Sequence, residues 1–510
     1  MKKCIIIGGG LGGLVTGALL SKEGYNVTVL EKNKNIGGGL QTFKRGGLTF
    51  DTGMHILGGL RSGGSINMIL TYLGIFDKLR IRKSDADCMD SITYLEDGRT
   101  YNIPEGRDAF TEYLINEFPI EKQGIRDYVD AIYRLANEVD LFNLRPTSDM
   151  LSRHSEQFMW PADELIKYYI KDERLRDILA YMNPRYGGIL GHTPAYIHAI
   201  IYVLYISGQD RFIGGSKQLS DALEQLILKS GGRILANEQV SRINVNNEHY
   251  CTCVDTVNDN SYSADYYISA IHPQSLVNLM AQGGLSKAYK MRIASLPNTY
   301  SAFIVYIKFR PNTFPYINHT CYFQEKYGIA WQHGEYDPAD DNWPHGFMYV
   351  TPAEEQTDYA TKMTIICLMP FSVVKQWQNT RTGHRGKDYM QWKHRNVERI
   401  LNRMDQLHPS FRETIDQLWS SSPLTIRDYY GQPEGALYGI QKDCNEIMMS
   451  RLTIGTKVKN LLLTGQNIYL HGFCGVQLTA IKTVETLIGQ NEIVKKINHF
   501  YTTKNVLKKK

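Results

Sequence analysis

The sequence lacks the features that mark membrane-spanning, secreted or metal-binding proteins. No run of about 18 apolar residues occurs in it, so no segment has the length of a transmembrane helix. Its eight cysteines are scattered, without a CxxC pair or any other metal-ligand spacing. We therefore expect reduced thiols, no metal site, and a cytoplasmic protein without a membrane span.

A large excess of charge is also absent. The formal net charge of +5 is small for 510 residues, and no array of basic and aromatic side chains occurs. The composition therefore indicates no nucleic-acid partner. With 43% hydrophobic and 21% charged residues it is typical of a globular enzyme, and the length predicts two or three intertwined domains.

What the chain does have is a glycine-rich turn between two apolar strands, CIIIGGGLGGLVTGALLSKEGYNVTVLEKN, at residues 4–33. Gly8, Gly10 and Gly13 match the GxGxxG spacing of a dinucleotide site, in which the glycines permit a tight turn, approach of the backbone to a pyrophosphate, and close helix–strand packing. Glu31 ends the second strand, where a carboxylate can accept hydrogen bonds from ribose hydroxyls. Cleavage of this apolar segment as a leader would destroy the site, so we expect none.

The α/β pattern is interrupted and then resumes. The block at 32–59 contains three consecutive glycines followed by a predicted hairpin. Residues 60 to about 210 look mostly helical and rich in aromatics. A glycine turn, an amphipathic helix and short strands return over 212–245, long apolar strands and a polar helix occupy 285–425, and 460–489 predicts a final strand, loop and helix beginning near Val476.

Several motifs together resemble the FAD-dependent polyene oxidoreductases, which include bacterial phytoene desaturases, carotenoid isomerases and retinol saturases. They are the N-terminal fingerprint, the double-glycine block with Thr42, DTGMH at 51–55, FIGGSKQL at 212–219, YYGQPEGALYG at 429–439 and LTGQN at 463–467. The glycine block and LLLTGQNIYLHGFCGV look more similar to the retinol saturases than to the desaturases. The helical insert and 285–425 match only in outline.

This resemblance implies an α/β fold with a Rossmann-like, GR2-like FAD-binding domain and a discontinuous α+β substrate domain. The FAD-binding domain is expected to comprise residues 1–75, 205–285 and 425–500, the substrate domain 76–204 and 286–424, with a basic tail at 501–510.

The resemblance also implies which residues contact FAD. The pyrophosphate is expected to contact Gly8, Gly10, Leu11, Gly12 and Gly13, and the adenosine ribose Glu31 with its neighbour Lys32. Gly38, Gly39 and Leu40 are expected on the ribityl side, and the backbone of Val240 at the adenine. Near the C-terminus, Gly465 and Gln466 are expected at the phosphates, and Val476 and Gln477 at the flavin. Gly39 replaces a usual arginine and Gln466 a usual aspartate. Because both changes remove a charge, FAD is expected to bind with lower affinity than in the desaturases.

The function that follows is redox or isomerase chemistry on a C=C bond of a hydrophobic polyene or isoprenoid. The candidate catalytic residues are His55, Tyr438 and His471, with Glu434 as a weaker candidate. The aromatics of the helical insert are candidates for the wall of a substrate tunnel, although an ordinary core role fits them equally well: Tyr168, Tyr169, Tyr196, Tyr202 and Tyr205.

Two other functions stay open. An amine oxidase-like enzyme would share the FAD scaffold but oxidise C–N bonds, and a non-catalytic FAD-binding carrier for prenylated partners would hold a flavin that nothing reduces. No second GxGxxG in a strand–helix context occurs, so the electron donor is not evident. The lysine-rich tail is expected to be a disordered, solvated end, or else a peripheral contact to anionic lipid.

Overall fold

The computed structural model describes the chain except residues 148–153, 282–283, 356–357, 447–449 and 509–510. Among the described residues, five parallel strands form a sheet in the order β10-β2-β1-β14-β20. Their bounds are β1 Lys3–Ile7, β2 Asn26–Leu30, β10 Arg233–Leu235, β14 Tyr266–Ser269 and β20 Leu461–Leu463. These strands are short apolar runs because helices and loops cover both faces of the sheet.

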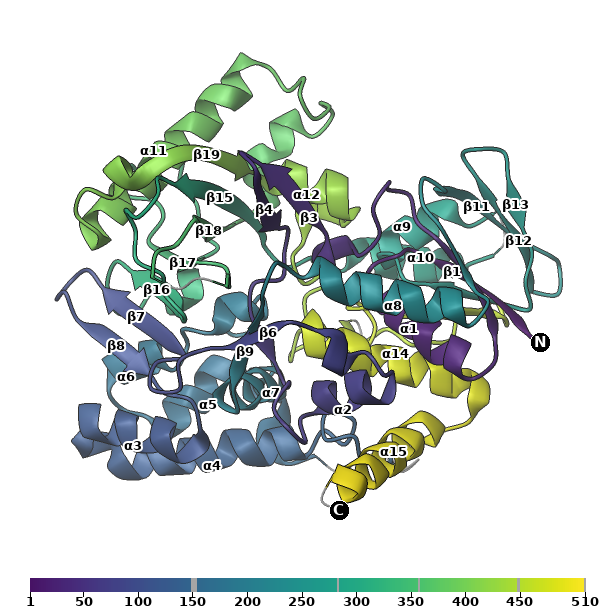
Figure 1. The fold of residues 1–510 in the computed structure, drawn as a ribbon, viewed down its shortest axis with the longest axis horizontal. Helices are drawn as coiled ribbons and strands as arrows, with labels where there is room; N and C mark the ends of the chain where they lie inside the picture. Colours follow the sequence, from purple (N-terminus) through teal and green to yellow (C-terminus); the bar gives the residue numbers. More distant parts are fainter. Residues whose placement is uncertain (148–153, 282–283, 356–357, 447–449, 509–510) are drawn as a thin grey trace.

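Three helices cover one face of this sheet: α1 Leu11–Lys22, α8 Lys217–Lys229 and α14 Gly472–Ile488 (Figure 1). Gly17 lets α1 pack closely, since a Cβ there would lie 3.1 Å from Ile227 of α8 and 3.3 Å from Ile6 of β1. The predicted helix near 216–230 is thus confirmed as α8, which ends before Gly231 at a φ of 83°. The Rossmann-like fold class is confirmed.

A small antiparallel sheet and two helices lie beside the parallel sheet. They are β11 Val240–Val245, β12 Cys251–Thr256 and β13 Ser261–Tyr262 with α9 Pro273–Leu279 and α10 Lys287–Ser295. Their apolar side chains share one core with the outer face of the parallel sheet. All eight cysteines, each within the described chain, are free thiols, as expected.

A second large sheet has seven strands in the order β19-β15-β18-β17-β16-β7-β8. Their bounds are β7 Asp90–Tyr94, β8 Thr100–Ile103, β15 Ser301–Phe309, β16 Thr320–Gln324, β17 Gly346–Val350, β18 Lys362–Met369 and β19 Ile415–Ser421. On β15, Phe303 and Val305 pack in the core under α11 (Lys387–Leu407). Ile304 and Tyr306, one residue out of phase, belong to the opposite face.

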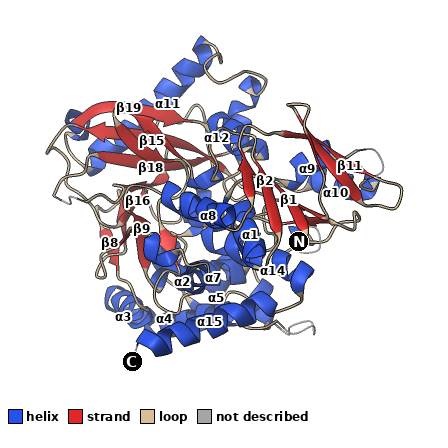
Figure 2. Ribbon diagram, turned by 45° about the vertical axis from the view of Figure 1, so that its right-hand side comes forward, coloured by secondary structure: helices blue, strands red, loops and turns tan. Residues whose placement is uncertain are grey.

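The remaining segment is mainly helical, with α2 Ser65–Tyr72, α3 Arg107–Glu117, α4 Lys122–Asn137, α5 Ala162–Tyr169, α6 Glu173–Ile178 and α7 Ala195–Ile206 (Figure 2). The prediction that residues 60 to about 210 are mostly helical nevertheless missed the strands in this range. The hairpin β7–β8 belongs to the seven-stranded sheet, and β9 Gln209–Phe212 pairs with both β5 Leu57–Gly58 and β6 Ile81–Lys83 in a small sheet. An Asp97-Gly98 turn between alternating residues was the missed signal for the hairpin.

Both ends of the C-terminal region also differ from expectation. Helix α14 begins at Gly472, and the prediction of a start near Val476 was wrong. No Ser, Thr, Asp or Asn occupies the cap position, so the usual sequence signal for a helix start is missing. Residues 501–508 of the tail expected to be disordered belong to α15 (Glu492–Lys508), which packs on α2. There Gly63 N–H donates to the Tyr501 hydroxyl (2.8 Å), and Lys504 Nζ lies 3.0 Å from Asp77. Within the described residues, no helix is long and apolar enough to span a bilayer.

The remaining elements are the predicted hairpin, β3 Thr42–Arg45 with β4 Leu48–Asp51, and α12 Pro423–Tyr430.

All five parallel strands fall within residues 1–75, 205–285 and 425–500, and the seven-stranded sheet falls within 76–204 and 286–424. The chain thus crosses between the two large sheets several times, which brings residues far apart in sequence to one place.

A buried carboxylate ties the helical segment to the seven-stranded sheet. Asp177 of α6 is 4% exposed and accepts hydrogen bonds from the Tyr94 hydroxyl (2.8 Å) and from Ala330 N–H (2.8 Å). Burial raises the pKa of Asp177 to about 6. The folded protein therefore holds a proton at this site more tightly than the unfolded chain does.

Asp177→Asn should remove a pH dependence of stability. Since the folded pKa is the higher one, ionised Asp177 disfavours folding at pH 7.5, and this cost disappears as the pH falls through about 6. Relative to the variant, the wild type should gain roughly 2 kcal/mol between pH 7.5 and pH 4. Urea unfolding at several pH values measures this, with Asp127→Asn on the exposed face of α4 as the control. A difference that does not vary with pH would contradict the assignment.

Candidate active site

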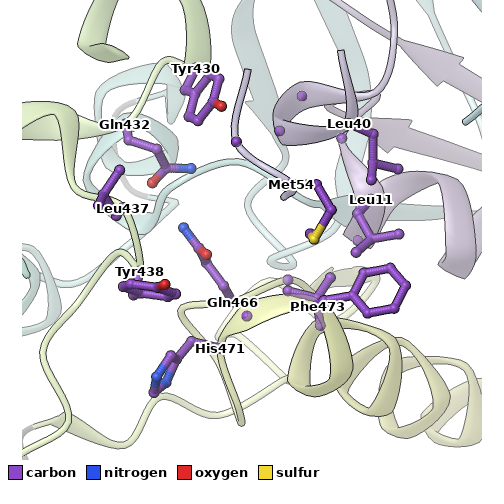
Figure 3. A pocket seen from close by; sticks show the side chains of 18 of the residues that line it. Leu11, Leu40, Met54, Tyr430, Gln432, Leu437, Tyr438, Gln466, His471 and Phe473 are labelled. Atoms are coloured by element: carbon purple, nitrogen blue, oxygen red, sulfur yellow. The ribbon is translucent and has the colours of Figure 1, made fainter. Parts of the chain in front are cut away.

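A cavity of about 550 Å³ is lined by both large sheets, by α7, and by the loops before α1 and α14. Figure 3 shows part of it, where side chains from the 429–439 loop face Leu11, Leu40 and Met54. Its lining divides into a polar end, built from backbone and glycines, and an apolar end, built from α7 and the seven-stranded sheet.

Glu31 fixes the wall of the polar end. It follows the last residue of β2, is 6% exposed, and accepts hydrogen bonds from Gly9 N–H to Oε2 (2.8 Å) and from Asn33 N–H to Oε1 (2.8 Å). Each carboxylate oxygen can accept a further bond, which suits a pair of ribose hydroxyls. Lys32 and Val240 line the same end.

Three glycine loops meet here with no side chain between them. A Cβ on Gly38 would lie 3.1 Å from the Gly10 Cα, and one on Gly12 would lie 3.0 Å from the Gly465 Cα. Gly13 serves packing, since its Cβ would fall 2.0 Å from the Gly8 carbonyl oxygen. The cradle is therefore lined by backbone, as a pyrophosphate site requires.

Two helices present their N-termini to the cavity. Helix α1 begins after Gly10 and α14 after His471, and neither cap residue bonds the first turn through its side chain. The cavity is lined by Leu11 and Gly12 of α1 and by residues 472–476 of α14. Free N–H groups at a helix start favour negative charge. The donors thus fit a diphosphate at α1 and an anionic flavin edge at α14.

The predicted FAD contacts converge on this cavity. Those that line it are Gly8, Gly10, Leu11, Gly12, Glu31, Lys32, Gly38, Gly39, Leu40, Val240, Gly465, Gln466 and Val476. Gly13 and Gln477 lie behind the lining. The Gln477 amide donates to the Phe473 carbonyl (3.3 Å), inside α14. The individual contacts to FAD stay predictions.

The apolar end has two walls. Helix α7 contributes Ile197, Ile200, Ile201 and Leu204, whose spacing places them on one face of the helix. Opposite the α7 wall, the seven-stranded sheet contributes an apolar row across three paired strands: Ile304, Ile366 and Met348. Sequence reasoning missed both walls, although the helical spacing on α7 was a usable signal.

The aromatic lining expected from the helical insert is largely absent. Of the five tyrosines proposed, only Tyr205 lines the cavity. Tyr168 is exposed, and Tyr202 is buried in the core with its hydroxyl bonded to the Leu179 carbonyl (2.5 Å). The ordinary core explanation was therefore the right one for Tyr202.

The three candidate catalytic residues all line the cavity. The Tyr438 ring meets His471 edge-on, with centroids 5.4 Å apart (Figure 3). Burial lowers the pKa of His471 to about 3, so its imidazole is neutral, and burial also lowers the pKa of His55. Burial raises the pKa of the Tyr438 hydroxyl, which keeps its proton. Glu434 lies outside the lining, where it accepts from Asn298 Nδ2 (3.1 Å).

The lining carries few charges. Among the described residues that form it, the carboxylates are Glu31 and Glu238, and both belong to the polar end, where Glu238 N–H donates to the Glu31 carbonyl (2.8 Å). The apolar end therefore offers no carboxylate to a cationic ligand.

A glycine cradle with two helix N-termini, joined to an apolar cavity under a second sheet, defines an FAD-dependent oxidoreductase of two intertwined domains. The family model described as flavin containing amine oxidoreductase matches residues 11–345, and the chain belongs to this family.

The chain is similar to known proteins over all or part of its length. It is 24% identical to the human all-trans-retinol 13,14-reductase over 527 residues, which covers 96% of this chain and 85% of the reductase. It is 26% identical to the chloroplastic prolycopene isomerase 1 of an Oncidium hybrid over 257 residues, covering 47% and 43% of the two chains. A crystal structure of an oxidoreductase from Methanosarcina mazei has the same fold, with a TM-score of 0.63, 18% identity and coverage of 95% and 100%.

Replacing Glu31 by Gln should weaken FAD binding. The amide keeps the shape of the side chain, but its NH₂ group must face one of the two backbone donors, Gly9 or Asn33. Hydrogen bonds to a charged group contribute roughly 1.5–3 kcal/mol, so we expect a loss of affinity of about tenfold or more. Titration of the apoprotein with FAD, followed by flavin fluorescence, measures it. Glu248→Gln in an exposed turn is the control, and unchanged affinity of the Glu31 variant would contradict the ribose assignment.

Proposed function

We propose that the protein is an FAD-dependent oxidoreductase that reduces a C=C bond of a hydrophobic polyene or isoprenoid substrate. The likeness to a retinol reductase over 96% of the chain and to a prolycopene isomerase over 47% supports this substrate class. The observation that carries the proposal is the apolar end of the cavity, walled by α7 and by the row through Ile304, Ile366 and Met348. Such walls suit a long hydrocarbon chain that offers few polar groups.

The residues around the cavity have different roles in the proposed reaction. FAD supplies or accepts a hydride when bound. Reduction of a C=C bond also needs a proton, which comes ultimately from solvent. The Tyr438 hydroxyl lines the cavity and stays protonated, although the burial that raises its pKa also makes it a weaker acid, so its proposed role is to relay this proton to the substrate carbon. His471 packs against the Tyr438 ring and orients it, and a neutral His55 lines the same space. The apolar walls exclude water from the reacting carbons.

Oxidation of an amine is disfavoured by the charges of the cavity. The apolar end offers a protonated amine no carboxylate among its described lining residues, although Tyr205, Tyr430 and Tyr438 line the cavity and aromatic rings can also hold a cation. The family takes its name from amine oxidation, so this alternative belongs in the test. A non-catalytic carrier for prenylated partners is the other outcome that the same test detects.

The C-terminal helix bears on how a hydrophobic substrate arrives. In α15, Lys496 pairs with Glu23 (2.6 Å) and Lys504 with Asp77 (3.0 Å), so these lysines hold the helix on the body of the protein. We infer that any contact with anionic lipid is peripheral.

The purified protein should carry FAD that polyenes reoxidise. After anaerobic photoreduction, all-trans-retinol or a carotenoid should restore the oxidised flavin spectrum, with a saturated product identified by mass spectrometry. Addition of putrescine or benzylamine to the oxidised enzyme should neither bleach the flavin nor release peroxide. Reduction by an amine would establish the amine oxidase alternative, and a flavin that responds to neither class would favour the carrier.

Filling the apolar end should block the reaction without releasing FAD. Ile201→Trp places an indole against the opposite sheet, so we expect polyene-dependent reoxidation to fall at least about 100-fold, which corresponds to roughly 3 kcal/mol of lost transition-state stabilisation. The flavin content should remain that of the wild type. Ile201→Val is the matched control and should retain most activity. Full activity of the tryptophan variant would mean that the substrate lies elsewhere.

A further inference from the structure

The loop at residues 431–439, which follows α12, forms one side of the cavity. Its Leu437 and Tyr438 are among the lining residues and lie along the same side in Figure 3. Two consecutive residues of the loop, Glu434 (φ 56°) and Gly435 (φ 61°), have a left-handed backbone. A residue such as glutamate keeps this conformation only where the surrounding contacts impose it. The contacts that hold Glu434 therefore bear on the shape of this side of the cavity.

The segment at residues 297–300 supports the loop. Leu437 N–H donates to the Tyr300 carbonyl (3.0 Å), and Tyr438 N–H donates to the Thr299 hydroxyl (3.1 Å). The backbone of the proposed proton-relay residue, Tyr438, is thus held by this segment.

Asn298, in the same segment, has a partner on each side of its amide. Its Nδ2 donates to Glu434 Oε2 (3.1 Å), and its Oδ1 accepts from His272 Nε2 (3.0 Å). The side chain of Asn298 therefore bridges the loop and His272.

His272 belongs to the dinucleotide end of the cavity. It follows β14, and a Cβ on Gly8 of the glycine turn would lie 2.9 Å from the side chain of the adjoining Ile271. His272 is completely buried, lines the cavity and caps α9, where its Nδ1 accepts from Gln274 N–H (3.2 Å). The bridge through Asn298 thus begins at the wall of the cofactor site.

The two partners determine which side chain fits at position 298. Burial lowers the pKa of His272 to about 4, so its ring is neutral. Because His272 Nδ1 accepts a hydrogen bond, the proton of the ring is on Nε2, which needs an acceptor. Glu434 presents a carboxylate, which needs a donor. An amide supplies both, whereas an aspartate can only accept.

We propose that Asn298 is a positioning residue that ties the loop at 431–439 to the dinucleotide end of the cavity and so keeps Tyr438 in place to relay a proton. The inference rests on the proposed function for the role of Tyr438. It adds a hydrogen-bonded link, from His272 through Asn298 to Glu434, between the cofactor site and the substrate-facing loop. Asn298 itself lies outside the described lining residues and acts through Tyr438.

Asn298→Asp should loosen the loop. Aspartate still accepts from His272 but places a carboxylate against that of Glu434, so the second contact becomes repulsive. Amide hydrogen exchange of the holoenzyme, followed by mass spectrometry, should become roughly three- to tenfold faster in a peptide that covers 431–439. A peptide from α11 is the internal reference and should not change. Unchanged exchange in the loop overturns the proposal.

Glu434→Gln supplies a matched control and a rescue. Its amide oxygen still accepts from Asn298, so the exchange of the loop should remain that of the wild type. Combined with Asn298→Asp, the NH₂ group of the glutamine donates to the new carboxylate and restores the contact with reversed polarity. The double variant should therefore match Glu434→Gln alone. A double variant as loose as Asn298→Asp would assign the defect to His272 and overturn the link to the loop.

A second variant decides if Asn298→Asp does not hold FAD. Glu434→Ala removes the acceptor on the loop and leaves the contact between Asn298 and His272 intact. It should speed the exchange of the loop over the same range, and exchange equal to that of the wild type would overturn the proposal.

Turnover is measured separately, so that the two hypotheses fail separately. In Asn298→Asp the limiting rate of polyene-dependent flavin reoxidation should fall roughly three- to tenfold and its solvent deuterium isotope effect should rise, with little change in the polyene concentration at half-maximal rate. A looser loop with an unchanged rate would overturn the role of Asn298 in placing Tyr438. If no polyene reoxidises even the wild type, the proposed reduction is wrong, and the exchange measurements still decide whether Asn298 holds the loop.

Discussion

The structure depends on close backbone-to-backbone contacts between three glycine loops. The turn after β1, the loop at 37–39 and Gly465 come from remote parts of the sequence, yet any Cβ at Gly12 or Gly38 would collide with the Cα of a partner loop. This contact sets how α1 sits on the parallel sheet and therefore where its free N–H groups point. It also leaves the dinucleotide end of the cavity without side chains except where Glu31 and its neighbours reach it.

Beyond the dinucleotide end, other elements of the fold line the cavity. The central strand β1 and the edge strand β20 of the parallel sheet lead into the cradle, while the wall beyond it comes from α7 and the row through Ile304 on the seven-stranded sheet. Because successive side chains of β15 point to opposite faces of the sheet, one set packs in the core beneath α11 and the other faces the cavity. One strand thus serves stability and substrate selection through adjacent residues.

The sequence was sufficient for the parts of the site that rest on local rules. Glycine spacing and a carboxylate at a strand end predicted Gly8, Gly10 and Glu31, because the backbone geometry they impose depends on near neighbours, while the other residues at the dinucleotide end were implied only by the family resemblance. The start of α14 was misplaced since no capping side chain marks it. The local Asp97-Gly98 signal of hairpin β7–β8 was overlooked, while the pairing of β7 with β16, more than 200 residues away, could not be predicted from the hairpin itself. The pairing of Arg185 with Asp90 joins a 3-10 turn to a strand of the other sheet. Nothing in either segment alone predicts it.

The order of the parallel strands has a consequence for biosynthesis. Strand β14 is paired on one side with β1, and its other edge is covered only by β20, which ends at Leu463. Helix α14, which packs on α1 and closes the cofactor cavity, follows still later. A nascent chain therefore exposes an unpaired sheet edge and half of a nucleotide site until residues 461–488 have left the ribosome. Both halves of the FAD cradle are present only after residues 461–488 have been synthesised, and chains stalled before Leu461 are the ones most exposed to aggregation.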